Sequence, residues 1–498
     1  MPARRTHLAP ETTHGALAAS LTALRAKNEV ADAFPPEVLA EAELVAPPDP
    51  ALDLREVPFV TIDPAESRDL DQAFHLERAG GGFILRYAIA DVPGVVRPGG
   101  ALDAEARRRG QTLYLPDGSI PLHPRELSED RASLLPGVDR VAFVWTIPVD
   151  ASGAAAFEGG DADPARVERA RIRSRAKLDY VGAQEQLDGG TATGPLALLP
   201  AFAEGRIAQE RRRGGASLNM ADEEVVRDEA GYRIERRFPL PVEEWNSQLS
   251  LLTGMLAGRM MLDAGVGILR TMPGPGEQAL AEFRARVKVL GIPWRDGLSY
   301  GEYLREVPRA TAQGAAILHA AASLFRGADY AAFGVEQDGA RLAPPAEPAQ
   351  AAIAAPYAHV TAPLRRLVDR WGLVICEALS AGHPVPAWAL ESLAEVPALM
   401  RSSSGLASRL GSAALDRVEA ALVRDRIGES FPAVVVESQG GSARVQLTDP
   451  PITARCPDPT GMRVAGTVAT VRVTRADVAT GEIQLEPVTP AGAVPARV

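Results

Sequence analysis

The hydrophobic period of this 498-residue sequence changes twice along its length. Between residues 57 and 150, apolar and polar residues alternate in stretches such as FILRYAIADV, and this pattern is typical of β-strands. From residue 240 to residue 425, apolar residues recur mostly at helical spacing. After Gly428 the period returns to two. A chain of this length, with strands and helices in separate blocks, is expected to be an α+β protein of more than one domain.

The last block, residues 426–488, has the length and spacing of a small β-barrel. Alternating apolar residues such as Val434 and Val436 are separated from the next such pair by turn sequences, QGGSA and ATGE among them. This spacing predicts a five-stranded OB-type barrel, a fold that commonly binds single-stranded nucleic acid. Phe431 is nearly the only aromatic residue there that could stack on a base, so a purely structural cap is an equal alternative. We expect residues 489–498 to form a flexible tail.

Residues 1–50 are expected to form a small helical module. Leu17, Leu21 and Leu24 recur at helical spacing, and the sequence FPP breaks the pattern before a second short helix. The first residues lack the apolar segment of a signal peptide, and no apolar stretch is long enough to cross a bilayer. We therefore expect a cytoplasmic protein that does not associate with membranes.

The net charge of −11 at first disfavours a nucleic-acid partner, because phosphate binding depends on basic surface. Local clusters of arginine could nevertheless line one channel while the outer surface stays acidic, and they comprise Arg107 to Arg109, Arg211 to Arg213, and Arg365, Arg366 and Arg370. Taken singly, each cluster is more typical of a solvated helix face. The only cysteines, Cys376 and Cys456, are far apart, which argues against a disulfide framework and a structural zinc site.

The stretch TIDPAESRDLDQAF, residues 61–74, concentrates carboxylates beside apolar residues. On an extended segment Asp69 and Asp71 face the same side, and a turn through PAES can bring Asp63 back beside them. Three converging carboxylates would repel one another unless they held a cation or formed an acid/base pair. Oxygen ligands without histidine or cysteine favour Mg²⁺ or Mn²⁺ over zinc. From spacing alone, an Asp-Pro turn with solvated charges is the somewhat better interpretation.

The same residues carry a family resemblance. TIDPAESRDLDQAF and the sequence from YAIADV to DRVAF, together with PYAHVTAPLRRLVDRWG at 356–372, resemble two signatures of the ribonuclease II/ribonuclease R (RNB) family. The resemblance spans about residues 55–425 and implies an RNB-type catalytic domain, a mixed sheet surrounded by helices, over residues 51–425. It also implies a processive 3′→5′ exoribonuclease that hydrolyses single-stranded RNA to nucleoside 5′-monophosphates in RNA decay, with Mg²⁺ or Mn²⁺ as cofactor. The C-terminal barrel then resembles the family's RNA-binding barrel.

The resemblance also assigns site residues. It places Asp71 and Arg365 in the chemical step, with Arg365 meeting the charge that develops on the phosphate. It implies metal binding by Asp63, Asp69, Asp71 and Gln72, and RNA binding by Tyr114, Arg366, Tyr357, His359 and Thr361. Tyr114 matches a tyrosine that stacks on a terminal base, and Arg366 is expected to clamp a neighbouring phosphate.

The sequence departs from the family pattern in three places. Gln72 stands where the family has a fourth aspartate, so we expect weaker metal binding, with activity surviving on three carboxylates. A second stacking aromatic would fall near Val266, which is aliphatic, and Trp245 is a candidate substitute. Family members commonly carry two cold-shock barrels before the catalytic domain, whereas the first fifty residues here are expected to form a helix-turn-helix-like module near the channel mouth.

Two alternatives stay open beside an active, monomeric exoribonuclease. Gln72 and Val266 are compatible with a catalytically weak or silent relative that binds RNA and regulates or protects it. A metal-dependent phosphohydrolase of small nucleotides is less favoured, because the predicted OB-type barrel is useful mainly for long strands.

Overall fold

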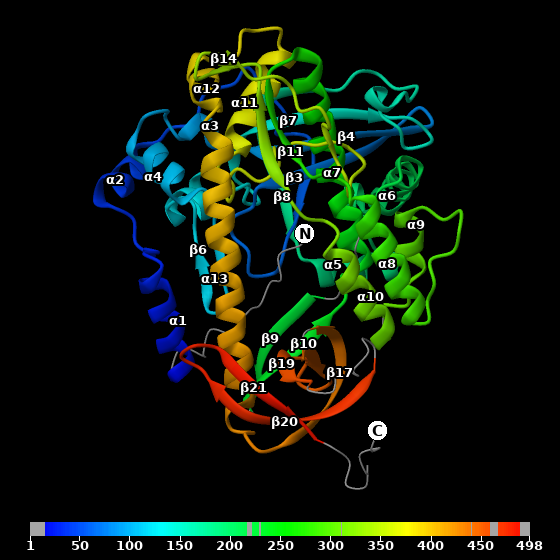
Figure 1. The fold of residues 1–498 in the computed structure, drawn as a ribbon. Coiled ribbons are helices and arrows are strands. Elements are labelled where there is room, and N and C mark those ends of the chain that lie inside the picture. The colour runs from blue at the N-terminus through cyan, green and yellow to red at the C-terminus, as the bar shows by residue number, and fades with distance from the viewer. Residues whose placement is uncertain are drawn as a thin grey trace.

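The computed structural model describes residues 15–216, 222–228, 231–309, 311–439, 441–458 and 467–488. Its centre is a six-stranded mixed sheet in the order β1-β8-β2-β3-β4-β7, in which β8 also pairs with β7 (Figure 1). The pairs β1–β8 and β2–β8 are parallel and the others are antiparallel. The strands of this sheet are β1 (Leu52–Asp53), β2 (Phe59–Ile62), β3 (Gln72–Ala79), β4 (Gly82–Ala90), β7 (Asp139–Val149) and β8 (Arg166–Leu178).

Because side chains alternate along the central strands, they pack into two separate cores, one on each side of the sheet. In β4, Leu85, Tyr87 and Ile89 join a large core to which several helices contribute, whereas Ala88 and Ala90 face a second core on the opposite side of the sheet. The helices beside the large core are α5 (Tyr180–Asp188), α6 (Gly194–Arg213), α7 (Pro241–Ala264), α11 (Asp369–Ser380) and α12 (Ala387–Leu393). The other side carries α2 (Pro36–Leu44), α3 (Val92–Val95) and α4 (Ala101–Arg109). The β3–β4 pair forms the hairpin that the strand alternation on both sides of AGGG, residues 79–82, indicates in the sequence.

A helical insertion with its own aromatic core follows β11. Phe283 packs edge-on against Trp294, Tyr300 and Tyr303. The helices are α8 (Glu277–Val289), α9 (Tyr300–Glu306) and α10 (Ala312–Ala322). Shorter strands surround them or lie at the edges of the body: β5 (Leu113–Leu115), β6 (Gly118–Ile120), β9 (Asp222–Asp228), β10 (Gly231–Arg237), β11 (Gly267–Thr271), β12 (Asp329–Phe333), β13 (Glu336–Gln337), β14 (Ala340–Arg341), β15 (Ala349–Gln350) and β16 (Ala355–Pro356).

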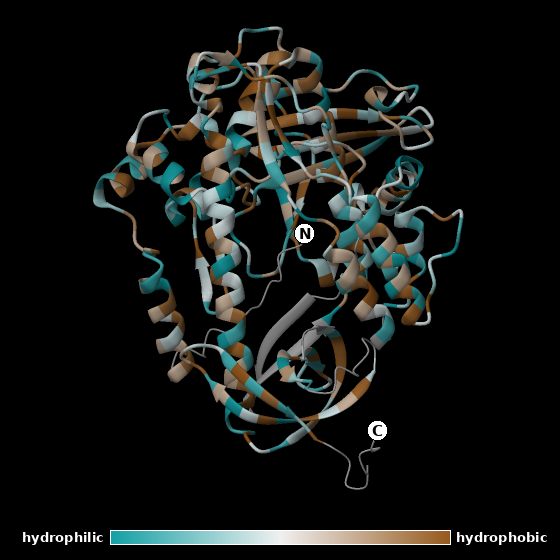
Figure 2. Cartoon of the chain, viewed as in Figure 1, coloured by the Kyte–Doolittle hydropathy of each residue, from teal (hydrophilic) through white to brown (hydrophobic). Residues whose placement is uncertain are grey.

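The C-terminal part is a long helix followed by a closed five-stranded barrel. The barrel was expected from the sequence, and the helix carries apolar residues at every fourth position from Leu406 to Leu422. The helix α13 (Val396–Arg424) is 29 residues long and extends from the body down to the barrel (Figure 1). The barrel order is β17-β18-β19-β21-β20, and its strands change between apolar and polar from residue to residue (Figure 2). Its strands are β17 (Ser430–Gln439), β18 (Ser442–Leu447), β19 (Thr453–Pro457), β20 (Val468–Asp477) and β21 (Glu482–Pro487).

Phe431 does not offer a stacking surface on this barrel. Only 2% of the residue is exposed, and it lies in the core that the barrel shares with α13. The alternation along β17 that places Val435 inside also places Phe431 inside. Phe431, nearly the only aromatic candidate for stacking in this barrel, is therefore not available to a base. The predicted flexible tail, residues 489–498, lies outside the described residues.

The two N-terminal helices are present, but they do not form a separate helix-turn-helix-like module. In α1 (Ala16–Lys27) the predicted leucine face packs into the core shared by α13 and the barrel. In α2, Val38 and Ala42 pack instead into the core beside α4 and the sheet. Each apolar face is narrow and is buried against a different part of the body, which explains the difference from the expectation.

Candidate active site

The acidic stretch begins where β2 and β8 end together. The Asp63 N–H donates to the Leu178 carbonyl at 3.1 Å, which continues the β2–β8 pairing by one residue. The turn that follows is held by Lys177, whose Nζ donates to the carbonyls of Ala65 at 2.5 Å and Ser67 at 2.6 Å. The turn geometry that places Asp63 at this end of the sheet is therefore fixed by a lysine from a neighbouring strand.

Asp69 and Asp71 project to the same side because Leu70 between them is fully buried. Leu70 lies in the core under the sheet, and its N–H donates to Ser133 Oγ at 3.0 Å. Ser133 Oγ in turn donates to the Arg68 carbonyl at 2.6 Å. These two hydrogen bonds hold the segment extended. Asp69 and Asp71 therefore lie on the side opposite to Leu70, as the spacing predicts.

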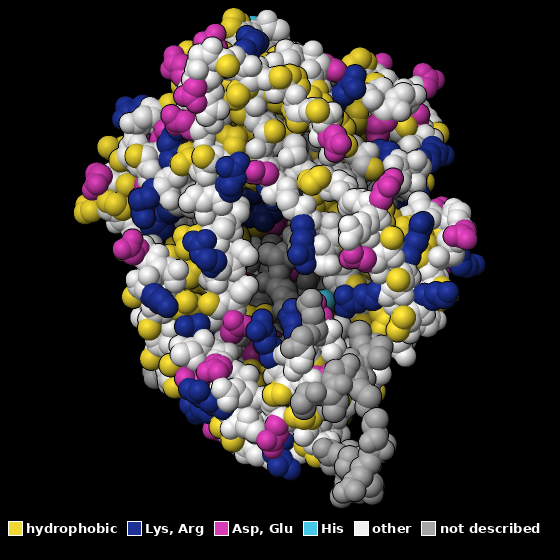
Figure 3. Space-filling model, viewed as in Figure 1, with side chains coloured by type: hydrophobic (Ala, Val, Ile, Leu, Met, Phe, Trp, Pro, Cys, Tyr) yellow, Lys and Arg dark blue, Asp and Glu magenta, His cyan; other side chains and the backbone are white. Residues whose placement is uncertain are grey.

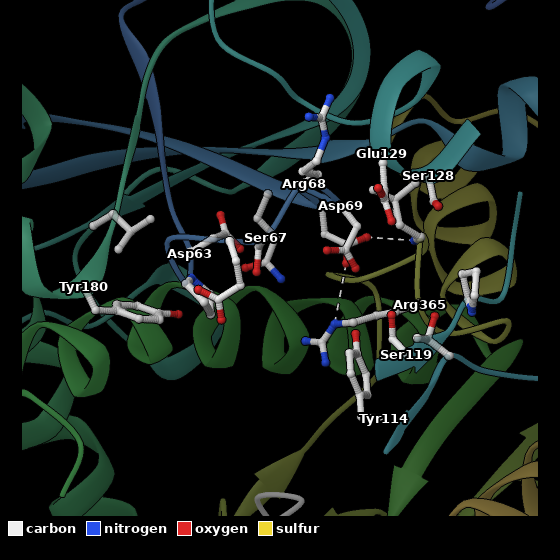
Figure 4. Close-up of a pocket in the computed structure, with 18 of the residues that line it drawn as sticks. Asp63, Ser67, Arg68, Asp69, Tyr114, Ser119, Ser128, Glu129, Tyr180 and Arg365 are labelled. Atoms are coloured by element: carbon white, nitrogen blue, oxygen red, sulfur yellow. Dashed lines mark hydrogen bonds and ion pairs between the residues drawn. The ribbon is translucent and has the colours of Figure 1, made fainter. Parts of the chain in front are cut away.

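These carboxylates line a pocket of about 460 Å³ to which distant segments contribute (Figure 4). The lining includes Asp63, Asp69, Asp71, Gln72, Tyr114 and Arg365, all of them predicted site residues. In Figure 4, Arg365 and Tyr114 lie on one side of Asp69. Asp63 lies on the other side, between Asp69 and Tyr180. The fold thus brings together side chains separated by about three hundred residues of sequence.

Asp71 is the most buried acid in the pocket. Its Oδ1 accepts the Leu364 N–H at 2.7 Å, and its Oδ2 lies 3.5 Å from Arg365 Nε. Burial raises the pKa of the Asp71 carboxyl well above its usual range; Arg365 opposes this rise and Asp69 adds to it. A cation beside Asp71 would reverse this effect, because positive charge favours the ionised carboxylate.

Gln72, the first residue of β3, accepts a hydrogen bond from the Tyr87 hydroxyl through its side-chain oxygen. Tyr87 is 1% exposed, and burial raises its pKa well above the usual range, so the phenol stays protonated and donates. The amide oxygen expected to bind a metal is therefore already engaged with Tyr87, which leaves less capacity for a cation at this position.

The expected convergence of three carboxylates is not found. Within the described part of the chain, no three His, Cys, Asp or Glu side chains are grouped closely enough to hold a metal ion. Asp71 is turned toward Leu364 and Arg365, and Asp63 lies at the end of a different strand. The donors still suit a hard cation, because the carboxylates and the amide along this wall offer only oxygen.

Tyr114 points into the pocket, as predicted. It is the middle residue of β5, and its neighbours Leu113 and Leu115 are buried while the tyrosine is 37% exposed. An aromatic ring that stays accessible at the edge of a polar pocket is suited to stack on a base.

Four predicted RNA-binding residues do not line the pocket. Arg366 is bound twice by Asp369, at 2.8 and 2.9 Å, and Tyr357 and Thr361 are only 8% and 3% exposed. His359 Nδ1 is 2.7 Å from the Tyr330 hydroxyl. These contacts fix the segment that presents Leu364 and Arg365, so the structure places Tyr357, His359, Thr361 and Arg366 behind the pocket wall rather than in it.

The predicted arginine channel is also not formed from the three clusters. Arg370 is fully buried and paired with Asp103 at 2.7 Å. Arg109 pairs with Glu105 one helical turn earlier, and Arg213 pairs with Glu158. Of the clustered arginines, Arg365 alone lines this pocket, because the others lie near acids of the protein itself or away from the cavity.

Several lining residues were not predicted from the sequence. Tyr180 begins α5 directly after Asp179, whose side chain caps the helix by accepting the Gly182 N–H at 2.8 Å. The other polar residues of the wall are Glu66, Ser67, Arg68, Thr112, Ser119, Arg125, Ser128, Glu129, Glu243, Asn246, Ser247 and Ser250. The capping sequence DYVG was the available signal for Tyr180. Val266 and Trp245 pack at the margin of the main core and do not line the pocket.

No helix in the described residues is long and apolar enough to cross a membrane.

Comparisons with known proteins agree with this architecture. The model of the RNB domain matches residues 51–375, and that of the RNase II-type exonuclease C-terminal S1 domain matches residues 429–488. Ribonuclease R of Mycoplasma pneumoniae is 35% identical over 190 residues, which cover 37% of this chain and 26% of that protein. Ribonuclease R of Vibrio cholerae is 30% identical over 260 residues, covering 50% of this chain and 31% of that protein. These matches therefore span about a third or less of each relative's length.

Solved structures share the fold at low identity. RNase R of Mycoplasma genitalium in complex with ribose-methylated single-stranded RNA has a TM-score of 0.83 at 18% identity, covering 95% of this chain and 78% of that chain. Yeast Ssd1, described as a pseudonuclease, has a TM-score of 0.68 at 15% identity, covering 92% of this chain and 58% of that chain. Because the RNB model alone covers more than half of the sequence, this chain belongs to the RNB-domain family.

Proposed function

We propose that this chain is a 3′→5′ exoribonuclease that hydrolyses single-stranded RNA to nucleoside 5′-monophosphates with a divalent cation as cofactor. The observation that carries the proposal is the meeting of Asp71, Tyr114 and Arg365 in one pocket of an RNB-domain protein. They come from three separate segments, and each suits a different part of the reaction.

Tyr114 holds the terminal base by stacking, which is independent of sequence because every base has an aromatic face. Arg365 is 32% exposed at its side chain and offers guanidinium N–H groups to the scissile phosphate. A planar guanidinium is well suited to the charge that accumulates on phosphate oxygens in the transition state. The Leu364 N–H holds Asp71 in place beside it.

Asp63, Asp69 and Asp71 are the proposed ligands of Mg²⁺ or Mn²⁺, which would supply an activated water and stabilise the leaving oxygen. Gln72 is proposed as a weaker contributor, because Tyr87 already occupies its side-chain oxygen. Hydrolysis at the 3′ end then leaves the phosphate on the released nucleoside.

The proposed path of the RNA strand to the pocket is a hollow on one face of the molecule. Figure 3 shows a hollow at the centre of one face, with Lys and Arg side chains around its rim, between α13 and the helices opposite it. A basic rim attracts the RNA backbone despite the acidic net charge. We propose that the barrel holds the upstream RNA, which would keep the enzyme on one strand through many cuts.

The test uses RNA labelled at its 5′ end, incubated with Mg²⁺, Mn²⁺ or a chelator. We expect a ladder that shortens from the 3′ end with metal and intact RNA with chelator. Asp71→Asn should retain RNA binding and lose shortening, since the amide oxygen can still accept the Leu364 N–H. Cutting by Asp71→Asn at the wild-type rate would remove this pocket from the mechanism.

A silent RNA-binding protein is the second candidate. Gln72, the absence of a grouped set of three carboxylates in the described residues, and the structural likeness to a pseudonuclease favour it. Retention of labelled RNA without shortening at any metal concentration would support this candidate. If Gln72→Asp then produced shortening, the missing carboxylate would be the cause.

A further inference from the structure

The hairpin that carries Tyr114 is too short to hold its own position. β5 and β6 have three residues each, joined by a two-residue turn at Pro116 and Asp117. Two-stranded hairpins are marginally stable when isolated, even when they are longer than this. The position of Tyr114 in the pocket therefore depends on what the hairpin packs against.

One face of the hairpin is buried against α1 and the C-terminal part. Leu113, Leu115 and Ile120 are 6%, 4% and 4% exposed and belong to the core shared by α1, α13 and the barrel. Tyr114 alternates with these leucines and faces the pocket instead. The ring and the shared core therefore lie on opposite faces of the same short strand.

The turn of the hairpin is bound by an arginine of α1. Arg25 Nη1 lies 2.9 Å from Asp117 Oδ1 and 2.8 Å from Oδ2, and the two side chains are 18% and 11% exposed. The residues directly after Asp117 are Gly118 and Ser119, both of which line the pocket. Ser119 is also the cross-strand partner of Tyr114. The ion pair at Asp117 is therefore directly adjacent in sequence to the pocket wall.

Further hydrogen bonds hold α1 itself and the base of the hairpin. α1 is anchored to the barrel, because Ser20 Oγ donates to the Val478 carbonyl at 2.8 Å and accepts Arg417 Nε at 3.0 Å. At the base of the hairpin, the Thr112 N–H donates to the Arg365 carbonyl at 3.0 Å. The hairpin is held at its base by the Arg365 segment and at its turn by α1.

We propose that α1 positions the 3′-end pocket, with Arg25 and Asp117 as positioning residues that hold Tyr114 in reach of the terminal base. The inference rests on the proposed function in one respect, that the 3′ end of RNA occupies this pocket. It assigns to the N-terminal helix an indirect role in substrate grip, which acts through Tyr114. Arg25 itself does not line the pocket.

The test compares Arg25→Ala, Asp117→Asn and the exchanged pair Arg25→Asp/Asp117→Arg. Complete loss of stacking on one ring weakens binding by roughly tenfold to a hundredfold. We expect each single variant to raise KM for single-stranded RNA by on the order of tenfold, since the leucine face still holds the hairpin in part. kcat should change much less, because Arg365 and the aspartates stay in place, and the exchanged pair should restore KM.

A binding measurement separates this inference from the proposed function. An RNA with 2-aminopurine at its 3′ end, added in chelator, should lose fluorescence on stacking, and Arg25→Ala should lessen that loss. Arg86→Ala breaks an ion pair with Glu77 at 2.6 Å that lies outside the pocket lining, and as the control it should leave both readouts unchanged. Thermal unfolding of each variant checks that α1 remains folded.

The outcomes are distinct. Unaltered KM and fluorescence in Arg25→Ala would overturn the positioning role whether or not the wild type cuts RNA. A parallel fall in kcat and stability, without rescue by the exchanged pair, would also overturn it. A wild type that quenches the fluorescence but does not shorten RNA would contradict the proposed nuclease and leave the positioning role supported.

Discussion

Two arginine–carboxylate pairs from one short segment of this protein have opposite character. Arg370 is fully buried and lies 2.7 Å from Asp103, which also accepts Arg107 Nε at 3.1 Å and the Gly99 N–H at 3.0 Å. Arg365, five residues earlier, is 32% exposed and lies 3.5 Å from Asp71. The first pair is closed off from solvent, and the second opens into the pocket.

The pKa values of the two acids differ accordingly. Burial alone would raise the pKa of Asp103, but Arg370, the Gly99 N–H and Arg107 outweigh it, so the pKa is lowered. For Asp71 burial prevails and the pKa is raised. An acid whose partners leave its charge incompletely compensated is available to a ligand, whereas a saturated acid is part of the scaffold.

The largest effect is expected for the closed pair. Arg370→Met leaves the Asp103 carboxylate buried without its main partner, which costs about 3–5 kcal/mol of stability. The midpoint of urea denaturation should fall, while RNA shortening per folded molecule should change little. A loss of activity in fully folded protein would mean that Arg370 also contributes to the pocket.

Arg365→Lys should affect activity instead of stability. Lysine keeps the charge but loses the planar fork, and removal of one transition-state donor lowers kcat by about 10²–10³-fold, or 2.7–4 kcal/mol. The rate of shortening of 5′-labelled RNA measures this effect. If Arg365→Lys lowered the midpoint of urea denaturation as much as Arg370→Met while kcat stayed unchanged, the open and closed pairs would not differ as the structure indicates.

The sequence predicted the elements whose signals are local. The β3–β4 hairpin follows from strict alternation around a glycine turn, and α13 follows from apolar residues at every fourth position. β8, Arg166–Leu178, was not predicted, because RVERARIRSRAKL is rich in charge. Its arginines are neutralised by acids far away in sequence, Asp91 for Arg169 and Asp139 for Arg173.

The candidate site likewise has one part that local spacing predicts and another part that depends on residues distant in sequence. Asp69 and Asp71 could be placed on one side because their spacing alone determines it in an extended segment. The family resemblance assigned Arg365 of LRRLVDR to the site, but residue spacing alone could not separate it from Arg366 and Arg370. The exclusion of Arg370 depends on Asp103, which lies 267 residues from it in sequence and pairs with it in the interior.

A pH experiment tests the buried surroundings of Arg370, where His123 lies. His123 is fully buried, and burial, with the nearby charge of Arg370, lowers its pKa to about 3 from the usual 6.5. The unfolded chain therefore binds a proton that the folded chain excludes, so this contribution to stability is complete above pH 6.5 and is lost as pH falls toward 3. At pH 5 the loss is about 2 kcal/mol relative to pH 7. Urea denaturation of wild type and His123→Leu at both pH values should show a smaller fall in the variant, and equal falls would exclude His123 as the source.

The smallest effect is expected for an ion pair whose charged atoms lie close together but whose side chains are exposed. Arg295 and Glu306 approach to 2.6 Å, slightly closer than Arg370 and Asp103, yet their side chains are 68% and 49% exposed. Water and salt screen such a pair, so Arg295→Ala should change stability by less than about 1 kcal/mol. A double-mutant cycle with Glu306→Gln, measured by urea denaturation at low and high salt, gives the coupling directly. If that coupling approached the cost of Arg370→Met, then separation rather than burial would set the strength of these pairs, and the contrast between Arg370 and Arg365 would have to be explained by distance alone.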